Sequence, residues 1–384
     1  MHVQGKTTNA KGQCLPQKGE VQLLCGGPPC QGFSSLNRFQ HTDKAMLKNS
    51  LVCTFLSCCD YYRPQLFLLE NVQGFLYHLE DRMLPLTMKS LLRMGYQCTF
   101  ARLQAGNYGV PQSRLRVFVL AAAPGQILPT FPNPRTSFTY RKQQYATFHP
   151  GTKVLAHAPL RAVALLDAIS DLAGVQPGKR GVSFQKAITH YQQMVIGDYK
   201  GPIRDHEVQT LSPLEQARVD RIPHIPGANW RDLPNARVLL SDGTYTDTLT
   251  FTTCANGVQG VCPRVAGGSC SILPAKTKRT LIPLFLAHKA GQEASQCKWE
   301  VAYSRLGWQD CIGTLRTQLS AQKSAALHPS QNRLLTVREC ARVQGFPDSF
   351  VFMGSTADKY MQVGNAVPPP LAAAIGQAIV RSLQ

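Results

Sequence analysis

A short turn near the start of the chain restricts its fold more than any other stretch. The apolar run 21–24 predicts a buried strand. Two glycines and two prolines follow at positions 26–29, and they impose a fixed turn in place of a smooth helix start. Cys30 comes directly after this turn, where its thiol can face a cleft. Because a thiolate is a strong nucleophile and nearby positive charge lowers the pKa that produces it, Cys30 is a candidate catalytic residue.

A buried structural thiol is the alternative for Cys30, since the chain has 13 cysteines and buried free cysteine is common. The odd count and irregular spacing predict no disulfide framework. The first residues lack the apolar core of a signal peptide, so we expect reduced thiols in the cytosol or the nucleus. No apolar run reaches the length of about 18 residues that a membrane span needs, so no contact with a membrane is expected.

The charge balance points to a polyanionic partner. The net charge is +19 and the isoelectric point is near 9.6, which is typical of proteins that bind nucleic acid. The excess is spread along the chain and forms no basic block. A basic protein without such a partner is the alternative.

Residues 1–128 alternate between apolar and amphipathic segments, which predicts an α/β sheet with a largely parallel core. Cys30 and Glu70 each follow a predicted strand. Ligands bind beyond the carboxyl ends of such strands, so we expect both residues in one cleft. The predicted strands are 21–24, 66–69, 97–103 and 116–123, and the predicted helices are 51–61, which Asn49 or Ser50 could cap, and 79–94.

The character of the chain changes in residues 129–332, where prolines, glycines and polar residues interrupt short apolar stretches. This composition predicts a second, irregular domain with short strands. Residues 333–384 are expected to return to the first domain. Helices are predicted at 162–172, at 212–221, at 336–344, where Thr336 and Glu339 form a capping-box pattern, and at 368–383.

Glu70, Arg114 and Arg116 are further candidates for chemistry. A carboxyl whose pKa is raised by burial can share a proton near neutral pH. The two arginines would lie on one side of an extended segment, where they can neutralise developing negative charge. Each has a plainer explanation when taken alone, because a glutamate after a strand often caps a turn and alternating arginines often form a solvated strand face.

Five motifs follow one another along the chain, namely Pro28-Pro29-Cys30-Gln31, Glu70-Asn71-Val72, Gln112-x-Arg114-x-Arg116, the segment 336–348 and the segment 362–369. Together they resemble the ordered motifs of the DNA cytosine-5 methyltransferases, and most closely the catalytic region of eukaryotic maintenance-type enzymes. The resemblance covers nearly the whole chain and implies a Rossmann-like methyltransferase sheet with an inserted, strand-rich target-recognition domain.

The resemblance implies a role for each candidate. The Cys30 thiolate would add to carbon 6 of cytosine, so that carbon 5 becomes nucleophilic enough to accept a methyl group. Glu70 would hold N3 and the exocyclic amine, and Arg116, supported by Arg114, would neutralise charge at O2. The target base must leave its stack, because both faces of the ring are needed.

Contacts with DNA and with the methyl donor are also implied by the resemblance. The loop 31–49 would close on double-stranded DNA, and Leu36 would fill the gap left by the flipped base. The expected DNA-contacting residues are Gln31, Ser34, Leu36, Arg38, Arg338 and Arg342, the last two bracing the recognition domain. The residues expected to hold S-adenosylmethionine are Pro29, Leu51, Asn365 and Val367.

Two departures from the family pattern stand out. Members carry a glycine loop for S-adenosylmethionine upstream of the Pro-Cys turn, and only 20 residues precede the first strand here. We therefore expect a truncated sheet and weak donor binding by this chain alone, with an upstream region or a partner chain supplying the rest. A family zinc site is represented by Cys262, Cys270 and His288, but Arg264 takes the place of a fourth ligand unless Cys254 substitutes.

The sequence thus predicts a nuclear DNA cytosine-5 methyltransferase that acts on CpG-type sites. An inactive DNA-binding or regulatory remnant of such an enzyme is the alternative. An RNA cytosine-5 methyltransferase is a third interpretation, and the long recognition domain fits it less well.

Overall fold

The computed structural model describes the chain as two compact units. The first contains residues 1–109, 113–162 and 369–384, and the second contains 110–112 and 163–368. The structure describes residues 14–29, 43–76, 83–140, 158–179, 186–233, 237–246, 302–322 and 324–384, with short pieces at 8, 11–12, 143–144, 147–149, 152–154 and 181–183.

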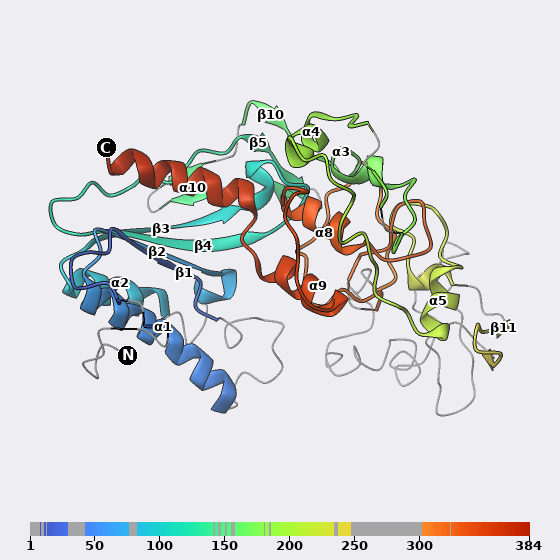
Figure 1. Cartoon of the computed structure of the whole chain (residues 1–384), viewed down its shortest axis with the longest axis horizontal. Coiled ribbons are helices and arrows are strands. Elements are labelled where there is room, and N and C mark those ends of the chain that lie inside the picture. The colour runs from blue at the N-terminus through green and yellow to red at the C-terminus, as the bar shows by residue number, and fades with distance from the viewer. Residues whose placement is uncertain are drawn as a thin grey trace. The chain divides into compact units, whose positions relative to one another are not determined.

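A six-stranded mixed sheet forms the centre of the first unit (Figure 1). β1 and β2 are parallel, and Gly26 opposite Leu69 is their last pair. β4 runs antiparallel to both β2 and β3. The strand order is β1-β2-β4-β3-β8-β9, with β1 at Leu23–Gly26, β2 at Leu66–Val72, β3 at Gln97–Gln104, β4 at Leu115–Ala122, β8 at Thr147–His149 and β9 at Thr152–Val154.

The predicted strands at 97–103 and 116–123 are confirmed, but the prediction of a largely parallel core is wrong. Residues 105–114 join β3 to β4 and contain the single-turn 3-10 helix η3, Ala105–Tyr108. A parallel connection needs a crossover of about a dozen residues or more, usually with a full helix, so this short link forces the antiparallel arrangement.

Helices cover both faces of this sheet, as Figure 1 shows. α1 (Asp43–Tyr62) and α2 (Met83–Arg93) lie on one face, and α10 (Pro369–Ser382) lies on the other. Alternate residues of β2 and β4 point toward α1 and α2, because successive side chains in a strand face opposite ways. The shared core includes Val52 and Leu56 of α1, Leu84 and Leu91 of α2, Phe67 and Leu69 of β2, and Val117 and Val119 of β4.

Both α1 and α2 differ from their predicted bounds. α1 begins at Asp43, so Asn49 and Ser50 lie inside the helix and do not cap it. α2 begins at Met83, after the 3-10 helix η2 at Gln73–Leu76. The predicted helix at 368–383 is confirmed as α10. The remaining strands of this unit are short, namely β5 (Thr136–Ser137), β6 (Thr139–Tyr140), β7 (Gln143–Gln144) and β10 (Leu160–Arg161).

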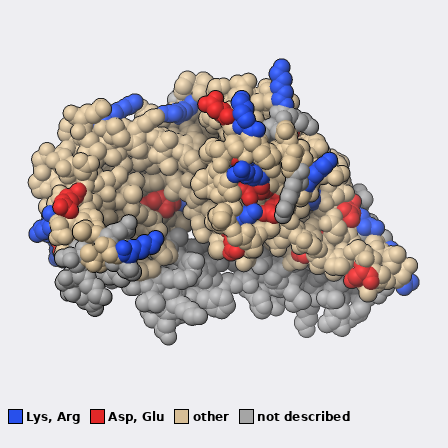
Figure 2. Space-filling view, in the orientation of Figure 1, with Lys and Arg blue, Asp and Glu red and all other residues tan. Residues whose placement is uncertain are grey.

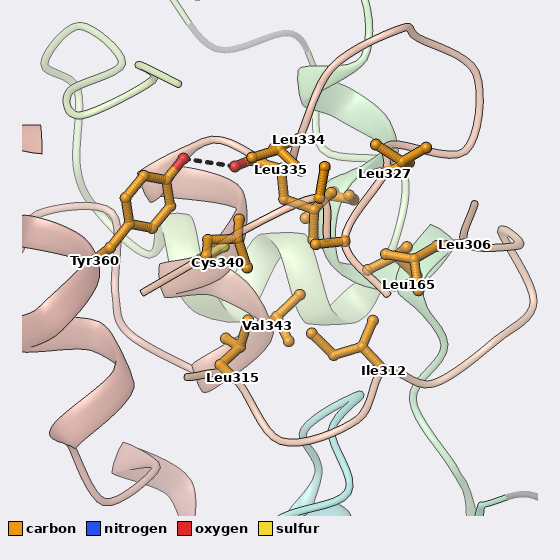
Figure 3. Close-up of a cluster of buried hydrophobic side chains, with 14 of the residues drawn as sticks. Leu165, Leu306, Ile312, Leu315, Leu327, Leu334, Leu335, Cys340, Val343 and Tyr360 are labelled. Atoms are coloured by element: carbon orange, nitrogen blue, oxygen red, sulfur yellow. Dashed lines mark hydrogen bonds between the residues drawn. The ribbon is translucent and has the colours of Figure 1, made fainter. Parts of the chain in front are cut away.

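The second unit packs short helices and loops around one apolar cluster (Figure 3). The Tyr360 hydroxyl donates a hydrogen bond of 2.7 Å to the Leu335 carbonyl at the edge of that cluster. The elements are α3 (Leu165–Ile169), η4 (Ser170–Leu172), α4 (His190–Ile196), α5 (Pro213–Val219), η5 (Trp230–Asp232), β11 (Val238–Leu239), β12 (Tyr245–Thr246), α8 (Val337–Gln344) and α9 (Thr356–Asn365).

Helices predicted in this region are confirmed, but a strand-rich domain is not. α8 starts at the predicted capping box, in which Thr336 accepts from the Glu339 amide and Glu339 accepts from the Thr336 amide. Within the described part of 163–332, the named strands are the two-residue pair β11 and β12. The contacts also divide the chain differently from the expected domains, because 129–162 belongs to the first unit and 333–368 to the second.

By length and apolar composition alone, the stretch Thr356–Ser382 could cross a membrane. It consists of two helices, however, and residues 366–368 between α9 and α10 are not helical. α10 buries Leu371, Ile375 and Ile379 within the first unit, as an ordinary core helix does.

Candidate active site

The site is organised around the carboxyl ends of β1 and β2. Residues 27–29 follow the last β1–β2 pair, and Glu70 and Asn71 lie on β2 beside them. A Cβ atom added to Gly27 would lie 2.9 Å from Oε2 of Glu70, so a larger residue at position 27 would require this carboxylate to move. The parallel pairing therefore places Glu70 against the turn that leads to Cys30.

Arg116 approaches Glu70 from the neighbouring strand. Its Nε lies 3.0 Å from Oε1 of Glu70, and the two side chains are 12% and 20% exposed. Its Nη1 donates a hydrogen bond of 2.8 Å to the Leu115 carbonyl, which fixes the guanidinium further. The antiparallel register, in which Val72 pairs with Arg116, brings the two charges together.

The surroundings of Glu70 act on its protonation in opposite directions. Burial raises the pKa of its carboxyl above the ordinary value. The charges of Arg116 and Arg114 and the hydrogen bond from Arg116 lower it, and burial outweighs them. A carboxyl in this balance can hold or share a proton nearer to neutral pH than an exposed glutamate can.

Arg114 is held in place through its backbone. Its side chain is 1% exposed, and its amide donates a hydrogen bond of 2.6 Å to Oε1 of Gln104. Nε2 of Gln104 donates to the Ser113 hydroxyl at 3.3 Å. Gln104 is fully buried at the end of β3. Its role could not be predicted from the sequence, because a glutamine at a strand end has many possible partners.

The expected donor-binding residues are accessible where the structure describes them. Pro29 is exposed beyond β1, and Leu51 is 40% exposed on α1 although its neighbour Val52 is buried. In the second unit, Asn365 is exposed as the last residue of α9, and Val367 is half-buried just after it. Each of these side chains is therefore accessible within its own unit.

Several predicted site residues lie outside the described residues, and nothing in the structure bears on them. They include Cys30 and the expected DNA contacts Gln31, Ser34, Leu36 and Arg38, as well as the zinc candidates Cys254, Cys262, Cys270 and His288. Among the residues that are described, no group of three or more His, Cys, Asp or Glu side chains could hold a metal ion.

Arg338 and Arg342 require a correction, because neither presents a charge to DNA. Both side chains are fully buried in the second unit. Arg342 pairs with Asp171 at 2.5 Å and with Asp348 at 2.7 Å. Arg338 pairs with Asp205 at 3.2 Å and lies 3.6 Å from Asp348. Three buried carboxylates and several carbonyls satisfy these guanidinium groups, so they hold 168–171, 204–205 and 347–350 around α8.

Basic side chains remain on the surface elsewhere. On the face drawn in Figure 2, Lys and Arg residues occupy several separate places over the described part of the chain. This distribution agrees with the spread of charge in the sequence.

The chain matches one protein family along nearly its whole length. The model of the C-5 cytosine-specific DNA methylase family matches residues 1–381. The chain is therefore a member of this family, as the sequence motifs predicted.

Named relatives are similar at substantial identity. DNA (cytosine-5)-methyltransferase 1 of Mus musculus is 45% identical, over 98% of this chain and 24% of that protein. DNA (cytosine-5)-methyltransferase PliMCI of Paracentrotus lividus is 43% identical, over 100% of this chain and 25% of that protein. The chain thus spans about a quarter of the length of these relatives.

A solved structure shows a similar fold. It is described as a DNA modification methyltransferase encoded within a prophage of E. coli, and it matches with a TM-score of 0.52 and 19% identity. The match covers 94% of this chain and 79% of that one. A Rossmann-like methyltransferase fold with a mixed sheet is therefore confirmed for this chain.

Proposed function

We propose that this chain carries the chemistry of a DNA cytosine-5 methyltransferase, which transfers a methyl group from S-adenosylmethionine to carbon 5 of cytosine in double-stranded DNA. The observation that supports this most strongly is the Glu70–Arg116 ion pair, which lies beside the turn preceding Cys30 in a chain of this family. The pair offers a carboxyl and a cation to the two sides of a pyrimidine that must become electron-poor before a thiolate can add.

Each residue has one task in the proposed reaction. The Cys30 thiolate forms a bond to carbon 6 of the cytosine, and the displaced ring electrons make carbon 5 nucleophilic. Glu70 shares a proton with N3 as negative charge builds there, and the raised pKa of its carboxyl suits that role. Arg116, supported by Arg114, stabilises charge at O2. Carbon 5 would then accept the methyl group as the donor leaves as S-adenosylhomocysteine, and loss of the carbon 5 proton with expulsion of the thiolate would complete the cycle.

The methyl donor would be held by Pro29, Leu51, Asn365 and Val367. S-adenosylmethionine supplies an electrophilic methyl group when it is bound. The Leu51 and Val367 side chains offer apolar surface, and the Asn365 amide offers hydrogen bonds to a polar part of the ligand.

Duplex DNA is the proposed substrate, and the nucleus is the proposed location. The net charge of +19 favours a polyanion. The loop 31–49, whose residues 43–49 form the first turns of α1, would contact the DNA around a flipped base through Gln31, Ser34, Leu36 and Arg38. The region 129–332 would recognise the flanking sequence. CpG-type sites are the proposed targets.

Methyl transfer tests the proposal. The purified chain is incubated with duplex DNA containing CpG steps and with a large excess of S-adenosylmethionine labelled in its methyl group, because donor binding by this chain alone is expected to be weak. We expect label in the DNA with the unaltered chain and with Cys53→Ala, because Cys53 is an exposed thiol on α1. Cys30→Ala should abolish the label. Label that persists in Cys30→Ala, or label that never enters DNA, contradicts the proposal.

A further inference from the structure

A buried glutamine spans the base of the link between β3 and β4. Gln104 is the last residue of β3, and its side chain is 0% exposed. Its Oε1 accepts a hydrogen bond of 2.6 Å from the Arg114 amide, and its Nε2 donates to the Ser113 hydroxyl at 3.3 Å. Oε1 also accepts from the Gly106 amide at 3.5 Å, which makes Gln104 the N-cap of η3. The side chain thus joins both ends of the link.

Arg114 lies directly beyond the β3–β4 ladder. Gln104 opposite Leu115 is the last pair of that ladder, and the Ala105 amide continues the register by donating to the Arg114 carbonyl at 2.9 Å. In an antiparallel pair of this kind the two residues exchange both backbone hydrogen bonds. Here the Arg114 amide donates to the Gln104 side chain instead. The side chain of Gln104 therefore takes the place of a ladder bond and fixes the backbone of Arg114.

The placement of Arg114 matters because its charge acts on Glu70. Arg114 continues the register of β4, so its side chain is on the same face as that of Arg116. Arg116 reaches Glu70 from that face, with Nε 3.0 Å from Oε1. Burial raises the pKa of the Glu70 carboxyl, and the charges of both arginines lower it. Among the described residues, these two arginines are the charged groups that act on this carboxyl.

We propose that Gln104 is a positioning residue for methyl transfer, which holds Arg114 where its guanidinium acts on Glu70. It does so through the backbone of Arg114, by supplying the acceptor that the ladder would otherwise provide. This inference rests on the proposed function, because it takes Glu70 as the group that shares a proton with the cytosine. If Gln104 only satisfied buried amides, its replacement would lower the stability of the fold and leave the protonation of Glu70 unchanged.

Titration of the Glu70 carboxyl distinguishes these two roles. The carboxyl carbon of isotopically labelled glutamate is followed by NMR against pH in the full chain, and the Glu70 signal is assigned by its loss in Glu70→Gln. Gln104→Met and Gln104→Leu both remove the donor and the acceptor and add no charge. Because Arg114 is then no longer held near Glu70, less positive charge lowers the pKa of the carboxyl. We expect the Glu70 titration to move to higher pH in both variants.

Arg114→Met shows whether Gln104 acts through Arg114. Removing the guanidinium should raise the pKa of the Glu70 carboxyl at least as far as Gln104→Met does, because the whole positive charge is lost. Adding Gln104→Met to Arg114→Met should then cause no further shift, since the two substitutions affect the same interaction. A Gln104 effect of unchanged size in the Arg114→Met background overturns the inference.

Thr136→Val is a matched control on the same link. The Thr136 side chain is buried, and its hydroxyl donates to the Gly106 carbonyl at 2.6 Å and accepts from the Gly109 amide at 3.2 Å. Valine removes both hydrogen bonds and leaves those of Arg114 in place. The carboxyl of Glu70 should therefore titrate as it does in the unaltered chain.

Three results overturn the inference. They are an unshifted Glu70 titration in folded Gln104→Met, an equal shift in Thr136→Val, and failure of both Gln104 variants to fold, which would make the residue structural. The titration needs neither DNA nor methyl donor, so it is independent of the proposed activity. A chain that shows the Gln104 effect but transfers no methyl group would contradict the proposed function alone. A chain that methylates DNA and shows no Gln104 effect would contradict this inference alone.

Discussion

The Oε1 atom of Glu70 lies 3.0 Å from Nε of Arg116, and the two residues come from different strands of one sheet. The antiparallel register between β2 and β4 creates this contact. Burial raises the pKa of the Glu70 carboxyl and outweighs the neighbouring arginines, which lower it. A group in this balance is suited to sharing a proton with a substrate nitrogen.

Replacing Glu70 by glutamine tests that role. Glu70→Gln keeps the shape of the side chain but cannot exchange a proton, so we expect single-turnover methyl transfer to fall by roughly 10²-fold or more. DNA affinity should change little, because the carboxylate does not contribute positive charge to phosphate binding. Unchanged turnover with intact folding would remove Glu70 from the chemistry.

Replacing glycine by alanine should change the free energy of unfolding differently at two helical positions. A Cβ atom on Gly364 of α9 would lie 2.6 Å from backbone atoms of Arg316, whereas one on Gly376 of α10 would meet nothing within 4 Å. Gly364→Ala should therefore destabilise the fold by about 1–3 kcal/mol. Gly376→Ala should be neutral or stabilise it by up to about 1 kcal/mol, because alanine favours helix. Urea unfolding measures both, and equal effects would contradict the packing described for α9.

A buried histidine makes the second unit sensitive to acid. Burial lowers the pKa of His328 to about 4, against the attraction of Glu339, and its Nδ1 accepts a hydrogen bond from the Ser330 amide. As pH falls below the ordinary value of 6.5, the unfolded chain binds a proton that the folded chain refuses, so stability falls. The loss is on the order of 2 kcal/mol near pH 5.

Glu339 adds to the acid sensitivity at lower pH. Although burial raises the pKa of its carboxyl, hydrogen bonds from Arg333 and the charge of Arg333 lower it to about 2. Its stabilisation is present above the ordinary pKa of 4.5 and is lost as pH falls toward about 2.

Thermal melting measured between about pH 7 and pH 5 tests the role of His328. The melting temperature should fall with pH over this range, and His328→Gln should make that fall less steep. An unchanged slope in that variant would assign the acid sensitivity to other groups.

Replacing a buried arginine of the second unit should lower the stability of the fold and leave DNA affinity unchanged. Arg342→Met leaves Asp171 buried without its cation and Asp348 with only the more distant Arg338, which should cost about 3–5 kcal/mol. Arg221→Met, at an exposed arginine of the same unit, should cost far less. The salt dependence of DNA binding, which counts phosphate contacts, should stay the same in folded Arg342→Met. A reduced salt slope with unchanged melting would restore Arg342 as a DNA contact.

Local signals in the sequence predicted local structure well. The capping box at Thr336 and Glu339 involves residues three apart, so it identified the start of α8 without any tertiary information. Strand β4 was found because its apolar residues are continuous from Val117 onward. The start of α1 was missed because Asn49 and Ser50 resemble caps, and only the structure shows that the helix continues through them.

Long-range relationships could not be predicted from the residues alone. The acidic partners of Arg342 include Asp171, which is far away in the sequence. The sequence alone does not distinguish a buried, paired arginine from an exposed one. The antiparallel direction of β4 depends on the length of the link from β3, which the strand pattern does not encode. By contrast, the convergence of Glu70 with the turn before Cys30 was expected from the ends of parallel strands, and the Gly27–Glu70 contact supports it.

Covalent capture of DNA tests the central claim most directly. Duplex DNA with 5-fluorocytosine at a CpG step blocks loss of the carbon 5 substituent, so a thiolate adduct that has accepted the methyl group cannot resolve. With S-adenosylmethionine present, we predict a denaturation-resistant complex between chain and DNA that Cys30→Ala does not form and Cys53→Ala does form. A complex that Cys30→Ala still forms, or DNA that binds without any covalent complex, would contradict the account.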